Sequence, residues 1–258
     1  MTGHAPTHAA ADLSGQTALV TGASAGLGWR FARVLAAAGA KVAIAGRRTE
    51  KLTELSALIA DEGGIALAVP MDMTDAEAIV SGVDAAEQAL GPVTILVNNA
   101  GIPDAQRATR MSVELIDAVI ATNLRGPFIL ACEIARRLIE RKLAGRIVNI
   151  SSAAAFHYAG EGAALYATTK GAVARMTEAL AVEWARFGIN VNAIAPGSFQ
   201  SEMMAGMIER MGDFADQLPR KRICDPALLD STLLYLCAPA SEAVTGTVIR
   251  VDDGQLPR

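Results

Sequence analysis

The sequence predicts an α/β fold in which a single domain is built on a parallel, doubly wound sheet of seven strands with helices on both faces. Three observations carry this prediction. Short apolar runs alternate with longer helical stretches, the runs are nearly all apolar rather than alternating, and the connections between them are short. Strands that are covered on both faces have this composition, and such alternation forms right-handed βαβ units.

The elements follow one another without a composition break that would mark a second domain. The expected strands are Thr17–Thr21, Lys41–Ala45, Ile65–Pro70, Val93–Val97, Arg146–Ser151, Ile189–Ala195 and Thr247–Val251. The expected helical segments are Leu27–Ala38, Glu50–Asp61, Asp75–Leu90, Val113–Arg141, Ala164–Arg186 and Pro226–Ala238. Residues 1–14 are expected to form a flexible leader, and residues 15–258 form the domain.

One stretch, Ser198–Arg222, fits no strand or helix pattern and carries several Met and Phe residues. It could be a surface helix that packs its Met face on the core. It could also be an adaptable apolar lid over a site, because Met fills irregular shapes well. Its position after the sixth strand favours the lid, since sites in such sheets form at the carboxyl ends of strands.

Composition and charge exclude several classes of protein. With 52% hydrophobic residues and a formal net charge of −4, the chain is not disordered and offers no general surface for nucleic acid or anionic membranes. The cysteines (Cys132, Cys224 and Cys237) are odd in number and lack CxxC spacing, so we expect neither a disulfide framework nor a metal site. No apolar run approaches the length of a membrane span, about 18 residues. The leader lacks the basic start of a secretory signal, so we expect a cytoplasmic protein.

A glycine-rich turn directly follows the first strand and opens the first helix. Thr21 to Gly28 reads TGASAGLG. Gly22 allows a sharp turn, while Gly26 and Gly28 allow the backbone and the helix start to approach a pyrophosphate closely. Free N–H groups and the helix dipole favour a phosphate there. The strand–turn–helix context favours dinucleotide binding over a simple tight turn.

The second strand ends without the acidic residue that dinucleotide folds often place against the ribose hydroxyls. Gly46 stands there, and Arg47 and Arg48 follow. A guanidinium attracts a 2′-phosphate through charge-assisted, often bidentate bonds, whereas a carboxylate would repel it. The alternative is a pair of solvated arginines at a helix start. Because cations are mildly unfavourable there, we expect NADP(H) to be preferred, with NAD(H) a possible second coenzyme.

Tyr166 and Lys170 lie one helical turn apart, on one face of a predicted helix. An ammonium about 5 Å from a phenol contributes roughly 3 kcal/mol at an effective dielectric of about 20, or about two pKa units. We therefore expect Lys170 to lower the pKa of Tyr166 towards the range useful for acid–base catalysis. A YxxxK pair alone is a short pattern, and an ordinary aromatic beside a solvated lysine is the alternative.

Further polar residues mark the ends of the neighbouring strands, where cofactor crevices form. The sequence NNAG, Asn98 to Gly101, closes the fourth strand, and two serines end the fifth. Asp72 follows the third strand, within reach of an adenine edge. Asn123 lies inside a long helical segment, an unusual place for a buried amide without a task.

With these motifs together, the chain resembles the short-chain dehydrogenase/reductase family, in its single-domain Rossmann-type branch with the spacing TGxxxGxG. The resemblance runs from Gln16 to Gly254. It implies that Tyr166 is the general acid/base, that Lys170 lowers its pKa and binds the nicotinamide ribose, that Ser152 orients the substrate carbonyl and that Asn123 holds a water of the proton relay. The implied cofactor contacts are Gly22, Ser24, Gly26, Leu27, Gly28, Arg47, Arg48, Asp72, Met73, Asn98, Ala100, Gly101, Tyr166, Lys170, Pro196, Gly197 and Ser201.

The sequence departs from the family pattern in four places. The segment from Ser152 to Tyr166 is one residue longer than usual, and Ser201 replaces a common threonine while keeping the hydroxyl. Ala25 stands where many NADP-preferring relatives have a basic residue, which leaves the phosphate to Arg47 and Arg48. His157 and Tyr158 lie in the lengthened loop and could contact substrate or solvent.

Together these features predict an NADP(H)-dependent oxidoreductase, which reduces a moderately apolar ketone with Tyr166 as general acid/base. Two other substrate classes stay open: 3-oxoacyl thioesters, although only Arg220, Lys221 and Arg222 offer a basic patch for a carrier protein, and sugars or polyols. A non-catalytic cofactor-sensing regulator is an alternative of another class, but such proteins typically lose part of the tetrad. The resemblance also implies a homotetramer with small-molecule substrates, in which the two longest helices pair across one interface and the C-terminal strand region across another.

Overall fold

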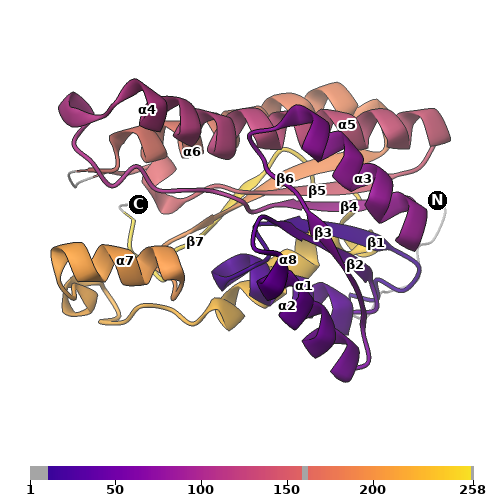
Figure 1. Ribbon diagram of the computed structural model, residues 1–258, viewed down its shortest axis with the longest axis horizontal. Coiled ribbons are helices and arrows are strands. Elements are labelled where there is room, and N and C mark those ends of the chain that lie inside the picture. The colour runs from indigo at the N-terminus through magenta and orange to yellow at the C-terminus, as the bar shows by residue number, and fades with distance from the viewer. Residues whose placement is uncertain (1–10, 159–161, 257–258) are drawn as a thin grey trace.

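The sheet that the sequence predicts is present, with all seven strands parallel. The computed structural model describes residues 11–158 and 162–256, and the strand order is β3-β2-β1-β4-β5-β6-β7 (Figure 1). The strands end within two residues of the predicted bounds, at Thr17–Thr21 (β1), Lys41–Gly46 (β2), Ile65–Pro70 (β3), Ile95–Asn98 (β4), Gly145–Ile150 (β5), Ile189–Pro196 (β6) and Val248–Val251 (β7).

Helices cover both faces of this sheet, in two layers (Figure 1). One layer holds α1 (Gly26–Ala37), α2 (Thr49–Asp61) and α8 (Asp230–Cys237); the other holds α3 (Ala76–Leu90), α4 (Val113–Ile120), α5 (Gly126–Arg141) and α6 (Ala164–Trp184). Side chains of successive strand residues point to opposite faces of the sheet, as the pleat requires, and so pack against opposite helical layers. Val20 packs with Phe31 of α1, whereas Leu19 packs with Leu130 of α5 in the second core.

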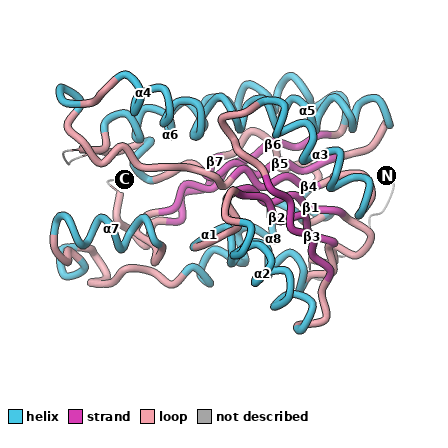
Figure 2. Tube along the Cα trace, viewed as in Figure 1, coloured by secondary structure: helices cyan, strands magenta, loops and turns pink. Residues whose placement is uncertain are grey.

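The two halves of the sheet wind in opposite directions from β1, which pairs with β2 on one side and β4 on the other. The loop after β1 leads to α1 in one layer, and the loop after β4 leads to α4 in the other layer. These two loops therefore diverge, and a crevice opens between them. Figure 2 shows the loops at this end of the sheet together with α7, which lies apart from both helical layers.

The predicted helix Val113–Arg141 is not one regular helix, because a π-helical turn, Ala121–Arg125, separates α4 from α5. By length and composition alone this run could cross a membrane, since its most apolar window has a mean hydropathy of 1.4. That finding corrects the expectation that no run is long enough. In the structure, however, Leu130, Ile134 and Leu138 of this run are buried against the sheet, which is the setting of a core helix.

The irregular stretch Ser198–Arg222 contains α7 (Glu202–Met211), a helix with no buried residue. Phe199, just before it, is buried in the core. Met203, Met204, Met207 and Met211 line the crevice instead, as the lid interpretation expects.

Part of the expected leader, residues 1–10, lies outside the described residues. Leu13 is fully buried in the core, and its backbone N–H donates to the carbonyl of Ala38 at the end of α1. This residue therefore packs with the domain.

Candidate active site

A crevice of about 1020 Å³ opens at the carboxyl ends of the central strands. Its walls come from the glycine-rich turn after β1, the ends of β2, β4, β5 and β6, the start of α6, and α7. Most of the predicted site residues line it: Gly22, Ser24, Gly26, Leu27, Arg47, Arg48, Asp72, Met73, Ala100, Gly101, Ser152, Tyr166, Lys170, Pro196, Gly197 and Ser201. Gly28, Asn98 and Asn123 do not form part of its wall.

The glycine-rich turn has the geometry of a phosphate cradle. Gly22 and Gly26 have φ of +64° and +54°, in the left-handed region that favours glycine. No side chain caps the N-terminus of α1, where Ala25 is the N-cap residue, and no acidic residue lies in its first turn. The dipole and the N–H groups of this 12-residue helix are therefore available to an anion.

Gly28 serves packing rather than direct contact. A Cβ atom there would lie 2.3 Å from the carbonyl oxygen of Gly22 and 2.5 Å from Nδ2 of Asn99. Only glycine lets the first turn of α1 approach β1 this closely, so the shape of the cradle depends on Gly28 although the residue does not line it.

The two asparagines of the NNAG motif have different tasks. Asn98 is buried, and its Nδ2 donates to Oδ1 of Asn149 at 2.9 Å and to the carbonyl of Pro127. Asn99 lines the crevice, and its Nδ2 donates to the carbonyl of Thr21 at 2.9 Å. The structure therefore places Asn99, which the sequence analysis did not single out, against the glycine-rich turn.

The polar residues after β2 and β3 flank the far end of the crevice. Nε of Arg48 lies 3.1 Å from Oγ of Ser24, so the arginine reaches back to the glycine-rich turn. Asp72 accepts hydrogen bonds from the backbone N–H and the hydroxyl of Thr74, at 2.9 and 2.8 Å. The pKa of Asp72 is lowered, chiefly by the Thr74 N–H and further by the nearby charge of Arg47.

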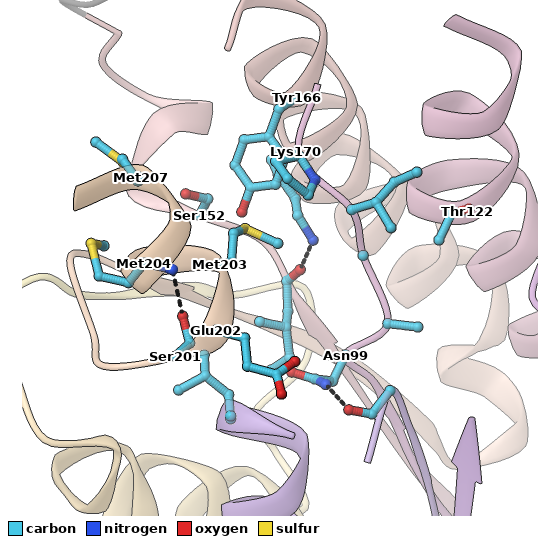
Figure 3. A pocket seen from close by; sticks show the side chains of 18 of the residues that line it. Asn99, Thr122, Ser152, Tyr166, Lys170, Ser201, Glu202, Met203, Met204 and Met207 are labelled. Atoms are coloured by element: carbon cyan, nitrogen blue, oxygen red, sulfur yellow. Dashed lines mark hydrogen bonds between the residues drawn. The ribbon is translucent and has the colours of Figure 1, made fainter. Parts of the chain in front are cut away.

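Tyr166 and Ser152 face each other across the middle of the crevice (Figure 3). Tyr166 lies in the first turn of α6, and Ser152 follows β5, with its Oγ also accepting the N–H of Ala154 at 3.1 Å. Burial raises the pKa of Tyr166, the hydrogen bond with Ser152 opposes that shift, and the negative charge of Asp104 adds to it. The phenol is therefore held in its protonated form.

Lys170 lies beneath Tyr166 on the same face of α6, as the i, i+4 spacing predicts (Figure 3). Its Nζ is buried 5.6 Å from the centre of the Tyr166 ring and donates to the carbonyl of Ile150 at 2.8 Å. Burial lowers the pKa of Lys170 to about 8.

The raised pKa of Tyr166 is opposite to the shift expected from Lys170. The expectation from the sequence counted the attraction between the two groups and left out their burial. In the structure desolvation acts on both side chains, and the ammonium points to a carbonyl oxygen rather than to the phenol.

Asn123 occupies the π-helical turn between α4 and α5 and is buried. Its Oδ1 accepts the N–H of Ile102 at 2.8 Å, and its Nδ2 donates to the Ile102 carbonyl at 2.9 Å and to Oγ1 of Thr169 at 3.3 Å. The side chain thus joins the loop after β4 to α6. A Cβ atom on Gly101 would lie 3.4 Å from both Asn123 Oδ1 and Lys170 Nζ, so these groups meet at the crevice floor.

A buried carboxylate that the sequence analysis missed holds the start of α6. Oδ2 of Asp104 accepts the N–H groups of Leu165 and Tyr166, at 2.9 and 3.1 Å, and Oδ1 accepts that of Ala105 at 2.8 Å. No side chain at the N-cap position, Ala163, caps α6. The available signal was an acidic residue three positions after the NNAG motif.

The lengthened loop after Ser152 and α7 form a further part of the crevice wall. His157 and Tyr158 line it, and Oη of Tyr158 accepts the N–H of Ala163 at 2.9 Å. Opposite them, Oγ of Ser201 caps α7 by accepting the N–H of Met204 at 3.1 Å. Within residues 11–158 and 162–256, no group of three or more His, Cys, Asp or Glu side chains could hold a metal ion.

Comparison with known proteins places this arrangement in a family. The family model described as short chain dehydrogenase matches residues 16–212. The chain is 38% identical to gluconate 5-dehydrogenase of Gluconobacter oxydans over 94% of this chain and 95% of that one. It is 34% identical to a 3-oxoacyl-(acyl-carrier-protein) reductase of Aquifex aeolicus, covering 94% and 98% of the two chains.

A solved structure from Beutenbergia cavernae, assigned as an NAD(P)-dependent gluconate 5-dehydrogenase and holding NADP at low occupancy, superposes with a TM-score of 0.87. It is 36% identical, over 95% of this chain and 98% of that one. The residues that the family model matches include the glycine-rich turn, the NNAG motif and the YxxxK pair. This protein therefore belongs to the short-chain dehydrogenase/reductase family of oxidoreductases.

Proposed function

We propose that this enzyme transfers a hydride between NADP(H) and a carbonyl or secondary alcohol, and that it reduces a moderately apolar ketone. One observation carries the proposal: the Tyr166 phenol faces the Ser152 hydroxyl in a crevice whose other end is an uncapped helix N-terminus behind a glycine-rich turn (Figure 3). Such a reaction needs a group that donates a proton to the substrate oxygen and a site that holds the phosphates of the coenzyme, and this crevice contains both.

The residues present fit a nicotinamide dinucleotide. The cradle at Gly22 and Gly26 suits the pyrophosphate, Asp72 and Met73 border the place for the adenine, and Arg47 and Arg48 suit a 2′-phosphate. The NADP found in the Beutenbergia relative is consistent with that preference. When bound, the nicotinamide supplies or accepts the hydride.

The side chains of the chain itself handle the proton. Ser152 donates a hydrogen bond to the substrate oxygen and orients it. Tyr166, protonated at neutral pH because its pKa is raised, gives its proton to that oxygen during reduction and takes it back during oxidation. Lys170 holds a positive charge under the phenol and stabilises the phenolate that forms.

The lid favours an apolar substrate, because Met203, Met204 and Met207 present thioether side chains to the crevice (Figure 3). A hydroxy acid of the gluconate type is a second candidate. Arg210 also lines the crevice and can present its guanidinium group to a carboxylate, and the Gluconobacter relative is named for such a substrate.

Reduction of carrier-bound thioesters and non-catalytic coenzyme sensing gain less support. A carrier protein would need the basic run at residues 220–222, but Arg220 and Arg222 both pair with Asp253, at 3.2 and 2.8 Å. A cofactor-sensing regulator without catalysis would not need the intact tetrad of Asn123, Ser152, Tyr166 and Lys170.

We also infer a cytoplasmic homotetramer. An apolar groove between α4, α5 and α6 is lined by Ile120, Leu124, Phe128, Ile129 and Met176, and Phe128 and Ile120 are 44% and 37% exposed. Exposed apolar side chains gathered on α4 and α5, beside α6, are typical of an interface between copies.

The proposed function is tested by following reduced coenzyme with NADPH and with NADH over a panel of apolar ketones, keto acids of the gluconate type, oxoacyl thioesters and sugars. Tyr166→Phe is the matched variant. We expect turnover with NADPH, and a kcat about 10²- to 10⁴-fold lower for the variant with coenzyme binding retained. Retained turnover in the variant contradicts the role of Tyr166, and a better kcat/KM with NADH contradicts the coenzyme preference.

A further inference from the structure

The guanidinium of Arg48 is engaged by a carboxylate from the opposite wall of the crevice. Nη1 and Nη2 of Arg48 donate to the two carboxylate oxygens of Glu202, at 3.1 and 2.9 Å, while Nε donates to Ser24 at 3.1 Å. Arg48 comes from the turn after β2, and Glu202 is the first residue of α7. A bidentate ion pair therefore joins the turn after β2, on one wall of the crevice, to α7 on the opposite wall.

The start of α7 lies directly against the phosphate cradle. A Cβ atom on Gly26 would lie 3.2 Å from Cβ of Ser201, the residue before Glu202. Both Glu202 and Arg48 line the crevice, and Figure 3 shows Glu202 beside Ser201 at this end of α7. The carboxylate of Glu202 is thus close to the place where the negative charge of a dinucleotide would be held.

We propose that Glu202 is a determinant of coenzyme selectivity, because its carboxylate competes with the 2′-phosphate of NADP(H) for the guanidinium of Arg48. This inference rests on the proposed function, in which Arg48 binds that phosphate. Glu202 weakens the binding of NADP(H) more than that of NAD(H), because NAD(H) has no 2′-phosphate that competes for Arg48.

The competition follows from the donors that Arg48 has. A guanidinium binds a carboxylate or a phosphate through the same fork of parallel N–H groups, and Glu202 occupies both terminal nitrogens. A 2′-phosphate that takes these donors must displace Glu202. A coenzyme that ends in a ribose hydroxyl has no charge with which to displace it.

The expected effect is modest, since the Arg48 and Glu202 side chains are 47% and 64% exposed. Exposed ion pairs are screened by water, so freeing Arg48 by Glu202→Gln should tighten NADP⁺ relative to NAD⁺ by about twofold to fivefold. The loss of one negative charge beside the pyrophosphate should also strengthen the binding of both coenzymes. That common effect cancels in the ratio of their Kd values.

The test is isothermal titration of the full-length protein with NADP⁺, NAD⁺ and the fragment 2′,5′-ADP. The variants are Glu202→Gln, Arg48→Ala, the double variant and Glu209→Gln, which removes the same charge from the same helix outside the crevice wall. We expect Glu202→Gln to raise the NAD⁺-to-NADP⁺ ratio of Kd and to tighten 2′,5′-ADP, and Glu209→Gln to change neither. In the Arg48→Ala background, Glu202→Gln should leave the ratio unchanged.

The possible outcomes distinguish a failure of this inference from a failure of the proposed function on which it rests. If Arg48→Ala lowers the ratio but Glu202→Gln does not raise it, Arg48 binds the phosphate and the competition by Glu202 is refuted. A lower ratio in Glu202→Gln also refutes it, since Glu202 would then hold Arg48 ready for the phosphate. If Arg48→Ala leaves the ratio unchanged, the assignment of Arg48 in the proposed function fails.

Discussion

The carboxylate of Asp104 caps the helix that carries Tyr166, accepting the backbone N–H of Tyr166 at 3.1 Å and that of Leu165 at 2.9 Å. The two residues are 62 positions apart in the chain, and Asp104 is only 3% exposed. A buried charge that accepts backbone N–H groups both fixes the helix start and places a negative potential beside the phenol.

Asp104→Asn should therefore change the pH dependence of ketone reduction. In the proposed mechanism, reduction requires protonated Tyr166, so the rate should fall as the pH rises through the pKa of this group. The charge of Asp104 raises that pKa, and its removal lowers it, so the falling limb of the kcat profile should move to lower pH. The loss of charge-assisted bonds should also reduce the free energy of unfolding by about 1.5–3 kcal/mol. A destabilised variant with an unmoved limb would mean that Asp104 has only a structural role.

The buried ammonium of Lys170 should make stability rise with pH. Its folded pKa of about 8 lies below the ordinary 10.5, so between these values the unfolded chain binds a proton that the folded chain has lost. The contribution of Lys170 to the free energy of unfolding should therefore increase between pH 8 and 10, by up to about 3 kcal/mol for the full interval at 1.36 kcal/mol per pKa unit.

Lys170→Met should lack this increase. The measurement is urea denaturation of both coenzyme-free proteins at pH 7, 8.5 and 10. The difference between the two removes the opposite effect of the three cysteine thiols and of Tyr166, whose pKa values are raised by burial in both proteins. Parallel curves for the wild type and the variant would show that Lys170 titrates alike in the folded and unfolded chains.

Gly28→Ala should disturb the phosphate cradle. The new Cβ would lie 2.3 Å from the Gly22 carbonyl, so the first turn of α1 must move. We expect a loss of about 1–3 kcal/mol in stability and weaker binding of both coenzymes. Gly171→Ala, in α6 and outside the crevice wall, is the matched control, since its Cβ would meet its nearest neighbour, the carbonyl oxygen of Ala155, at an ordinary 3.8 Å. Equal coenzyme binding by wild type and Gly28→Ala, measured by titration, would contradict this role of Gly28 in the cradle.

Phe128→Glu should disrupt the proposed tetramer. The substitution puts a charge into the apolar groove between α5 and α6, where a partner chain would have to bury it. Static light scattering should give a tetramer for the wild type and a smaller species for the variant. Ile65→Glu places the same charge at the exposed start of β3, an edge strand of the sheet, and should keep the wild-type mass. A monomeric wild type would refute the proposed assembly.

The sequence predicts those features that depend on short-range patterns. The sharp turn at Gly22, the shared helix face of Tyr166 and Lys170, and the seven apolar strands each follow from local spacing, and the structure confirms the placement of these elements. The placement of Ser152 opposite Tyr166 came from the family resemblance, and the geometry agrees with it.

The features that could not be predicted depend on partners far away in the chain. Nothing near Asp104 shows that it will meet a helix 62 residues later. Hydrophobic periodicity does not distinguish a π-helical turn from a regular one, so the setting of Asn123 stayed hidden. The opposite pKa shift of Tyr166 arises from burial, which the spacing of two residues does not reveal.

Because no side chain of α7 is fully buried and the helix stands outside both helical layers, substitutions in it remove little of the packing that forms the two cores. Selection can therefore alter residues 203–211, and with them this part of the crevice lining, at a small cost in stability. Glu202 is the exception, since a change there would also alter the grip of the helix on Arg48. The crevice wall that this segment forms is thus easier to change at the middle of α7 than at its first residue.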